Sequence, residues 1–404
     1  MTMGTQHWID IEKKHFLQTG KRLPAVLIRG EGTRVWDLDG KEYLDFVGGI
    51  AVVSLGHAHP VITEALQRQS QQLVTTSNHY YTLPQLKLAE LLCNLSGMDR
   101  AFFCNSGAEA VEGLIKIARK WGKEQRDGAF EIIVADGAFH GRTLATVTAS
   151  SNEKYRAPFT PLAEGFVRVP FDDVPAIKAA TTGKTAAVLL EPIQGEGGVN
   201  VPADDYLVRV REWCDEAGVL LLLDEVQTGA GRTGKMFAFQ HTSIEPDALA
   251  VAKAMGGGYP IGAFLVKEHA ASLAPGEHGT TFGGNALGCE VAFSVLTYMV
   301  EQGLMNEVTK RGDHIERRLH ALADRQPMVT EVRGKGLIWA VELDRPASED
   351  IVNACLERGL LVNAVKPTAL RFVPPFTVSD DEIDQALEIV EAVLATVAER
   401  EANG

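Results

Sequence analysis

Lys253 is the only charged residue among residues 248–263, where the sequence reads ALAVAKAMGGGYPIGA. Small and apolar neighbours cannot solvate an ammonium group, so a lysine here is costly unless it is paired or neutral. Burial also lowers the pKa of a lysine, and this makes the side chain a usable amine nucleophile. A lysine at the edge of a helix, with its charge in water, explains the segment equally well. The rest of the chain must therefore decide between these interpretations.

Asp224 stands at the end of another apolar segment, GVLLLLD at residues 218–224. A carboxylate at the end of a buried strand is costly unless a cation meets it. One interpretation is a structural residue that caps a helix or forms an ion pair. The other is a permanent anion that keeps a heterocyclic nitrogen protonated, which pyridoxal phosphate requires to act as an electron sink.

A third feature, Ser106-Gly107-Ala108, follows the apolar segment RAFFC at residues 100–104. A strand that turns into the N-terminus of a helix leaves backbone N–H groups free, and these can bind a phosphate. Alone, the motif fits a plain strand-to-helix turn equally well. Together, the three features supply a phosphate cradle, an acid and an amine. A pyridine ring with an aldehyde and a phosphate uses all three, so the sequence predicts pyridoxal 5′-phosphate as the cofactor.

An α/β sheet is needed to bring these residues together. Apolar segments alternate with helical patterns from about residue 85 to residue 300. We expect strands at 100–104, 131–136, 185–192, 218–225 and 262–266, and helices at 107–124 and 206–217. Strands that are apolar throughout predict a parallel or mostly parallel sheet covered on both faces. Ligands bind beyond the carboxyl ends of such strands, which is where the three features stand.

The predicted domain organisation has three parts. We expect an N-terminal arm that packs with the small domain at residues 1–60, a large cofactor-binding α/β domain at 61–305, and a small C-terminal α+β domain at 306–404. In the arm, residues 34–46 predict a β-hairpin in which Asp39-Gly40 supplies the positive φ values of a tight turn.

The small domain is indicated by a change of pattern after about residue 305. Residues 329–343 and 369–378 are typical of half-buried strands. SDDE at 379–382 is a capping box that opens the last helix. That helix carries one apolar stripe, formed by Ile383, Leu387, Val390, Leu394 and Val397.

Composition excludes several classes of function. The 404-residue chain has a formal net charge of −14, which argues against nucleic acid or a membrane as a partner. Its five cysteines are widely spaced and form no CxxC, which argues against disulfides and zinc and fits a reducing cytoplasm. His57 and His59 lack a third ligand nearby, so we expect them to be structural and predict no metal site.

The chain resembles the class III (ω-amino) aminotransferases of the pyridoxal-phosphate fold-type I family nearly end to end. The motifs that carry this resemblance are RGEGTRVWDLDGKEYLDFVGGIAV, LGHAHP, NSGAEA, AFHGRT, EPIQGEGGV, LLDEVQTGAGRTGKMFA, AKAMGGGYPIGA, GTTFGGN and LRFVPP. The resemblance implies a large domain with a mostly parallel sheet, a smaller α+β C-terminal domain and an N-terminal arm.

The resemblance also assigns roles at the cofactor. It implies that Lys253 binds the cofactor covalently and later moves a proton as a general base, while Asp224 pairs with the pyridinium nitrogen. Thr281 is similar to a threonine that contacts the phosphate from the neighbouring subunit, which implies a homodimer with shared active sites. The other cofactor-binding residues are Val226 and Phe139 on the ring faces, Gln227 at the phenolic oxygen, Ser106, Gly107 and Ala108 at the phosphate, and Glu225.

Arginines suit the carboxylates of the two small-molecule substrates, because the guanidinium fork binds a carboxylate through two hydrogen bonds. The resemblance implies that Arg142 takes the α-carboxylate of the amino donor and, in the second half-reaction, the distal carboxylate of 2-oxoglutarate. It implies that Arg371 takes the α-carboxylate of 2-oxoglutarate. Glu196 resembles a gate that pairs with Arg371 while the donor is bound, and Thr280 is expected at the donor. For Arg232 we expect a surface ion pair.

The implied reaction is a ping-pong transfer of the δ-amino group of N2-acetylornithine to 2-oxoglutarate, as in arginine biosynthesis. The alternative donors are 4-aminobutyrate, ornithine, succinylornithine and acetyl-lysine. An aminomutase needs no external oxo acid, so Arg371 and Glu196 favour the two-substrate cycle. A nicotinamide-dependent dehydrogenase would carry GxGxxG after its first strand, and none is present. Val111 and the Lys366-Pro367 loop depart from the family pattern and are expected near the substrate entrance.

Overall fold

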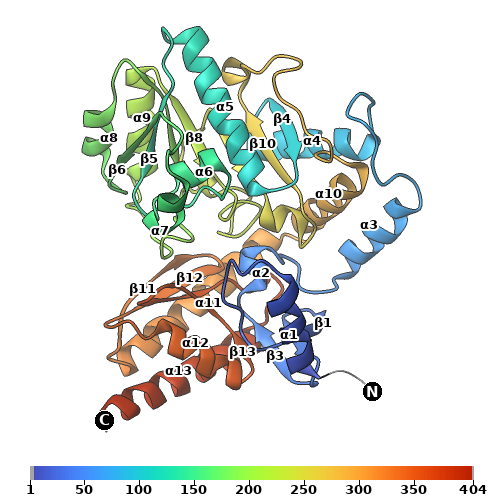
Figure 1. Ribbon diagram of the computed structural model, residues 1–404, viewed down its shortest axis with the longest axis vertical. Helices are drawn as coiled ribbons and strands as arrows, with labels where there is room; N and C mark the ends of the chain where they lie inside the picture. The colour runs from blue at the N-terminus through green and yellow to red at the C-terminus, as the bar shows by residue number, and fades with distance from the viewer. Residues whose placement is uncertain (1–3, 403–404) are drawn as a thin grey trace.

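The computed structural model describes residues 4–402 and shows two parts, one above the other in Figure 1. The larger part holds a seven-stranded sheet, and the smaller part combines the C-terminal elements with the N-terminal helix α1 (Thr5–His15). The predicted division at residues 60 and 305 stays a prediction, and its outer limits at residues 1 and 404 lie outside the described residues.

The large sheet has the strand order β4-β10-β9-β8-β7-β5-β6. Strand β10 runs antiparallel to both neighbours, and the other adjacent pairs are parallel, so the prediction of a mostly parallel sheet is confirmed. The strands are β4 (Arg100–Cys104), β5 (Glu131–Ala135), β6 (Phe166–Val169), β7 (Thr185–Leu190), β8 (Leu220–Asp224), β9 (Ala248–Val251) and β10 (Gly262–Val266).

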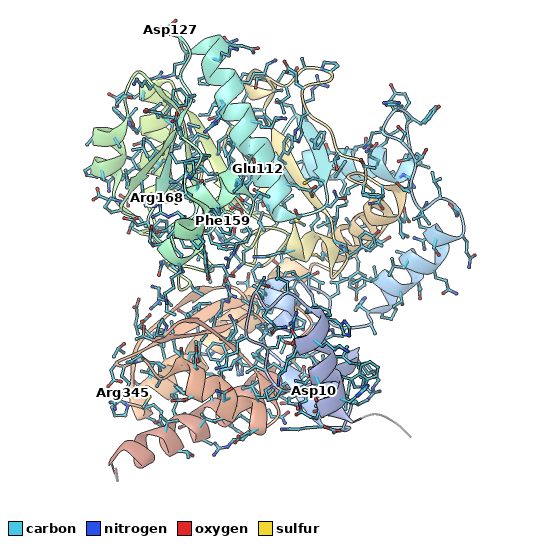
Figure 2. All side chains as sticks on the ribbon, viewed as in Figure 1. Asp10, Glu112, Asp127, Phe159, Arg168 and Arg345 are labelled. Carbon is cyan, nitrogen blue, oxygen red and sulfur yellow. The ribbon has the colours of Figure 1, made fainter. Side chains whose placement is uncertain are left out.

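Strands β6 and β9 are the two that the sequence analysis does not predict. Both have only four residues, which is too short for a clear pattern. Strand β6 also contains Arg168 (Figure 2), which donates a hydrogen bond of 2.5 Å to the carbonyl oxygen of Ser150 at the edge of the sheet. A polar residue with a tertiary partner therefore interrupts the apolar signal of that strand.

An all-apolar strand such as β8 is stable because helices cover both of its faces. Leu220 and Leu222 pack in a cluster with α5 (Gly107–Gln125), whereas Leu221 and Leu223 belong to the cluster that includes α9 and α10. The other helices of this part are α3 (Pro60–Ser70), α4 (Leu83–Ser96), α6 (Leu144–Ala149), α7 (Glu153–Arg156), α8 (Val174–Ala180), α9 (Tyr206–Ala217) and α10 (Ala286–Glu301). No helix within residues 4–402 is long and apolar enough to cross a membrane.

The smaller part is built on an antiparallel sheet of order β11-β12-β15-β14. The capping box is confirmed, because the backbone N–H groups of Ser379 and Glu382 each donate to the other residue's side chain. Val397 is half-buried, and the rest of the predicted stripe is buried. The elements are α11 (Leu304–Arg325), β11 (Val329–Lys335), β12 (Ile338–Leu343), α12 (Ser348–Glu357), β14 (Asn363–Lys366), β15 (Ala369–Phe372) and α13 (Asp380–Ala402).

The N-terminal strands form a separate sheet with a C-terminal strand. Strands β1 (Leu27–Glu31), β2 (Arg34–Asp37) and β3 (Glu42–Asp45) are antiparallel, and β3 pairs in parallel with β13 (Leu360–Leu361). The predicted hairpin is present, but of its two turn residues only Gly40 has a positive φ, of 85°. The short turn α2 (Gly48–Ala51) then leads to Val52 and to the large sheet.

Candidate active site

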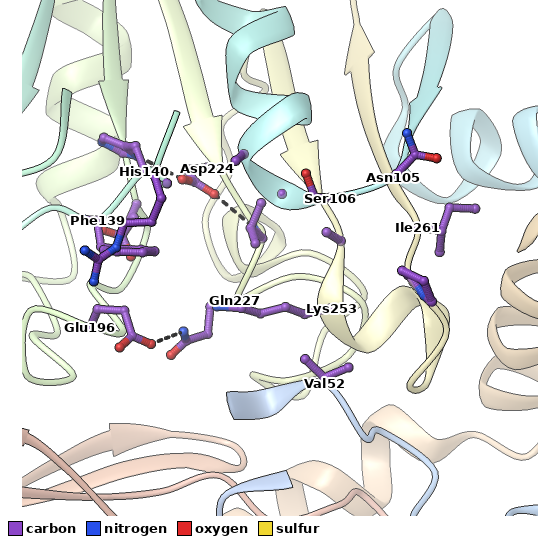
Figure 3. Close-up of a pocket in the computed structure, with 18 of the residues that line it drawn as sticks. Val52, Asn105, Ser106, Phe139, His140, Glu196, Asp224, Gln227, Lys253 and Ile261 are labelled. Atoms are coloured by element: carbon purple, nitrogen blue, oxygen red, sulfur yellow. Dashed lines mark hydrogen bonds and ion pairs between the residues drawn. The ribbon is translucent and has the colours of Figure 1, made fainter. Parts of the chain in front are cut away.

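A pocket of about 440 Å³ lies where the carboxyl ends of the central strands meet (Figure 3). Asp224 ends β8, Lys253 follows β9, Ser106 follows β4 and Phe139 follows β5. These four positions are far apart in sequence, and the sheet brings them to one edge, as the rule for ligand sites in α/β sheets predicts.

Lys253 is the first residue of a short 3-10 helix (Lys253–Gly256), and its half-buried side chain lies on the wall of this pocket and not on the outer surface. Burial lowers the pKa of its ammonium group, and the charge of Glu196 opposes that effect. No hydrogen bond or ion pair from the described residues engages Nζ. Its backbone has a positive φ of 44°, a strained conformation for a side chain of this size. The side chain is thus presented as a free amine inside the pocket.

Asp224 is buried, and both of its oxygens have partners on the protein. Oδ1 accepts a hydrogen bond of 3.0 Å from the backbone N–H of Val226, and Oδ2 lies 2.8 Å from Nδ1 of His140. A carboxylate only accepts, so this contact places the imidazole proton on Nδ1. His140 is buried too, and its Nε2 has no partner among the described residues.

Sequence reasoning missed His140, although one signal could have found it. The residue stands in AFHGRT, just beyond the end of β5, in the same relation to that strand as the predicted site residues have to theirs. Glu191 was missed as well. It follows β7, accepts hydrogen bonds from the N–H groups of Phe139 and Gly195, and has its pKa raised by burial.

The N-terminus of α5 faces the pocket with unused donors. The Ser106 hydroxyl caps the helix by accepting from the N–H of Glu109 at 3.2 Å. The N–H groups of Gly107 and Ala108 have no acceptor in the part of the chain that the structure describes, as expected for a first helical turn. A Cβ on Gly107 would lie 2.6 Å from Cγ1 of Val226, so only glycine fits there.

Arg371 comes from β15 and is fully buried. Its Nη1 donates to Oε1 of Glu196 at 2.5 Å and to Oε1 of Gln227 at 3.0 Å, while Nη2 has no partner among the described residues. Burial alone would raise the pKa of Glu196, but the positive charges of Arg371 and Lys253 hold that pKa below its usual range. The pair that the sequence analysis expects is therefore formed, next to the free amine.

Arg142 is exposed on the pocket wall, and its guanidinium carbon lies 3.4 Å from the centre of the Tyr155 ring. The same carbon lies 5.6 Å from the ring centre of Phe139. Neither an acid nor a carbonyl among the described residues bonds to this guanidinium. Its N–H groups are free for a ligand.

The chain was compared with known proteins. The family model for class-III aminotransferases matches residues 17–394. The chain belongs to the class III aminotransferases. It is 49% identical over 398 residues to the acetylornithine aminotransferase of Methanocaldococcus jannaschii, covering 98% of this chain and 100% of that protein. It is likewise 49% identical over 385 residues to the acetylornithine aminotransferase of Myxococcus xanthus, covering 94% and 96%.

Solved structures agree with the fold of this aminotransferase. The acetylornithine aminotransferase of Elizabethkingia anophelis superposes with a TM-score of 0.87 at 35% identity, covering 98% of this chain and 100% of that one. An ornithine aminotransferase of Toxoplasma gondii, described as showing partial occupancy of PLP at its active site, has a TM-score of 0.95 at 34% identity, covering 98% and 95%. The resemblance and the fold class that the sequence predicts are confirmed.

Two residues near Asp224 are fully buried away from the pocket, and for Arg232 the prediction is wrong. The side chain of Glu225 accepts from the N–H groups of Ala238 and Phe239, and its predicted role at the cofactor stays a prediction. Arg232, expected in a surface ion pair, is fully buried in this aminotransferase and donates to the carbonyl oxygens of Leu337 at 2.9 Å and Pro374 at 2.6 Å. Both residues therefore hydrogen-bond to backbone groups of the protein interior.

The departures from the family pattern do not line the pocket either. Val111 is buried in the core between α5 and the sheet, and Lys366 lies against Gly198. Gly113 in α5 is required by packing, because a Cβ at this position would lie 2.2 Å from the ring of Phe264.

Thr280 and Thr281 also lie outside this pocket. They line a second hollow of about 1110 Å³ between residues 75–81 and 275–283. Thr280 accepts a hydrogen bond of 3.3 Å from the side chain of Asn105, which reaches the first pocket from β4. Within one chain, neither threonine contacts the site beside Lys253.

Proposed function

We propose that this aminotransferase uses pyridoxal 5′-phosphate to move the δ-amino group of N2-acetylornithine to 2-oxoglutarate. The products are N-acetylglutamate 5-semialdehyde and glutamate. The observation that carries the proposal is the ion pair between the buried Arg371 and Glu196, beside the free amine of Lys253. The relatives named acetylornithine aminotransferase, which are 45–49% identical over nearly the full length, support N2-acetylornithine as the donor.

The residues present fit the cofactor. The unused N–H groups of Gly107 and Ala108 suit a phosphate, and the fixed carboxylate of Asp224 suits a protonated ring nitrogen. Val226 and Phe139 line the pocket and would flank the ring, with Gln227 beside its phenolic oxygen. When bound, the cofactor supplies an electron sink that stabilises negative charge on the substrate carbon.

The protein's own residues then have separate roles in the reaction. Lys253, whose pKa is lowered by burial, can take the proton from the amine-bearing carbon of the substrate through Nζ. His140 donates to Oδ2 of Asp224 and so fixes the orientation of that carboxylate. Glu191 and His140 line the pocket together with Asp224, and all three side chains are buried, so this side of the site has little contact with water.

Two substrates bind in turn, and the two arginines differ in whether their guanidinium groups are free to bind a carboxylate. Arg142 is unpaired and can take the carboxylate of the donor at once. Arg371 is held by Glu196, so it becomes available only when 2-oxoglutarate displaces that carboxylate. This difference favours a two-substrate cycle over an aminomutase, which needs no external oxo acid.

A homodimer is part of the proposal. Large apolar side chains stand exposed around the hollow that contains Thr281, and exposed apolar patches of this kind mark protein interfaces. They are Leu73, Val74, Tyr80, Tyr81, Leu83 and Phe282. A second copy on this surface would bring Thr281 to the neighbouring phosphate site. Sedimentation of the purified protein tests this, and a monomer at micromolar concentration contradicts it.

The decisive experiment is the visible spectrum of the cofactor-loaded protein before and after N2-acetylornithine is added without an oxo acid. We expect the absorbance of the covalently bound cofactor to disappear, and to do so faster than with ornithine or 4-aminobutyrate. The Lys253→Ala variant should bind the cofactor only non-covalently and show no such change. A yellow protein that ignores N2-acetylornithine but reacts with another donor contradicts the proposed substrate.

A further inference from the structure

We propose that Tyr155 is a positioning residue that sets the carboxylate specificity of the pocket by holding the guanidinium of Arg142 over its ring. The proposal rests on the proposed function, in which Arg142 binds a substrate carboxylate. Tyr155 does not itself line the pocket, so it would act on the substrate through Arg142.

The geometry is that of one guanidinium group within reach of two aromatic rings. The Arg142 guanidinium carbon is 3.4 Å from the Tyr155 ring centre, and the Tyr155 and Phe139 rings meet edge to face at 6.3 Å and 86°. Cation–π contacts act within about 6 Å of a ring centre, so Arg142 is within reach of both rings. Phe139 is the side chain that would cover one face of the cofactor ring, so this arrangement connects the carboxylate-binding group to the reacting centre.

Stacking suits this arginine because it fixes the side chain without using its donors. A guanidinium held by an acid, such as that of Arg371, must first lose that partner before a substrate carboxylate can bind. A guanidinium held through its face keeps its N–H edge free for a bidentate contact. The exposed Arg142 has no acid or carbonyl partner among the described residues, so the rings are its observed support.

Tyr155 lies in the short helix α7, which local contacts stabilise without Tyr155. The side chain of Asn152 caps that helix by accepting from the N–H of Lys154 at 3.0 Å, and Arg156 forms an ion pair with Glu153. The Tyr155 hydroxyl has no hydrogen-bond partner within residues 4–402. The ring, and not the hydroxyl, is therefore the group that matters, and phenylalanine should replace it without loss.

The test compares Tyr155→Leu, Tyr155→Phe and the matched control Phe159→Leu. Phe159 is an aromatic residue on the same segment (Figure 2), 53% exposed and outside the pocket. Each holoenzyme is given N2-acetylornithine or N-acetylputrescine, which is the same donor without its α-carboxylate. Because a cation–π contact contributes about 0.5–2 kcal/mol, we expect Tyr155→Leu to lower kcat/KM for N2-acetylornithine about 2-fold to 30-fold, by raising KM.

The same variant should leave kcat/KM for N-acetylputrescine unchanged within about twofold. General damage to the fold cannot produce such a selective loss. Tyr155→Phe and Phe159→Leu should match the unmodified enzyme. Binding gives a readout without turnover: in a Lys253→Ala background, calorimetry should show a weaker Kd for N2-acetylornithine when Tyr155 is leucine. Equal losses with both donors, or no loss with either, would overturn the proposal.

A second comparison separates this inference from the proposed donor. If the unmodified enzyme does not react with N2-acetylornithine, the proposed donor is refuted but the role of Tyr155 is not. The protein loaded with pyridoxamine phosphate still reports on Tyr155, because 2-oxoglutarate has a distal carboxylate and pyruvate has none. Tyr155→Leu should raise KM for 2-oxoglutarate and leave pyruvate unaffected. Equal changes for the two oxo acids would refute the role of Tyr155 whatever the donor is.

Discussion

Removal of the Glu196 carboxylate should make the enzyme bind 2-oxoglutarate more tightly. In the structure this carboxylate occupies Nη1 of Arg371, the group that we expect to bind the α-carboxylate of the oxo acid. The oxo acid must therefore break an existing ion pair before it can form its own. In Glu196→Ala that competition is gone, and the guanidinium keeps its hydrogen bond to Gln227 at 3.0 Å.

The size of the effect follows from the contact. The Glu196–Arg371 hydrogen bond is 2.5 Å long, with a fully buried guanidinium and a carboxylate side chain that is 28% exposed. A hydrogen bond to a charged group contributes about 1.5–3 kcal/mol. Solvent reaches the carboxylate and Gln227 remains, so the lower half of that range applies. This corresponds to a Kd for 2-oxoglutarate that is about 10-fold to 40-fold tighter, by the usual conversion of about 1.4 kcal/mol per factor of ten.

The assay is a stopped-flow competition on the holoenzyme, in which 2-oxoglutarate slows the half-reaction with the amino donor. Glu196→Gln is the matched control, because its amide oxygen can still accept from Arg371 without a charge, and it should give a smaller shift. If 2-oxoglutarate binds Glu196→Ala no better than the unmodified enzyme, the carboxylate does not compete for Arg371 and the gating argument fails.

Three further predictions concern buried charges. Asp224→Ala should lower kcat by orders of magnitude in steady-state assays, with His140 left without its acceptor; turnover within tenfold of normal would contradict the role of the anion. Burial raises the pKa of Glu225 from 4.5 to about 7. Between those pH values the Glu225 carboxyl is therefore ionised in the unfolded chain and protonated in the folded one. Urea unfolding should therefore show that the free energy of unfolding of the unmodified protein falls by about 3 kcal/mol relative to that of Glu225→Gln as pH rises from 4.5 to 7. A difference between the two proteins that does not change with pH would refute this. Arg232→Ala should cost about 3–5 kcal/mol of unfolding free energy, whereas the exposed Arg209→Ala should cost under about 0.5 kcal/mol; similar values would restore the surface interpretation of Arg232.

Patterns that depend on local physics were predictable from the sequence. The run of leucines in β8 needs two covered faces, so it predicts a central strand of a mostly parallel sheet. Ser379 and Glu382 cap a helix through groups three residues apart, which needs no knowledge of the fold. Lys253 and Asp224 were found because placing a charge among apolar residues costs free energy, and a functional role accounts for that cost.

Interactions that depend on tertiary contact were not predictable in this way. Glu225 and Arg232 look like ordinary polar residues of a loop, and only the fold shows that each binds buried backbone groups. His140 acquires its importance from a strand 84 residues away in sequence that ends in Asp224. Thr281 is a residue whose predicted role requires another chain, and nothing within one chain tests it.

The buried position of Arg232 also indicates how the two substrate specificities are separated. Arg142 lies in the loop after β5, on the larger part of the molecule, whereas Arg371 reaches the pocket from β15 of the smaller part. Arg232 connects the loop after β8 to the carbonyl groups of Leu337 and Pro374, which flank β12 and β15. A change at Arg232 should therefore displace Arg371 and leave Arg142 where it is. Arg232→Lys, which keeps the charge but loses the fork, should raise KM for 2-oxoglutarate several-fold and leave KM for the amino donor unchanged. Equal changes in both would show that the two parts do not position the arginines independently.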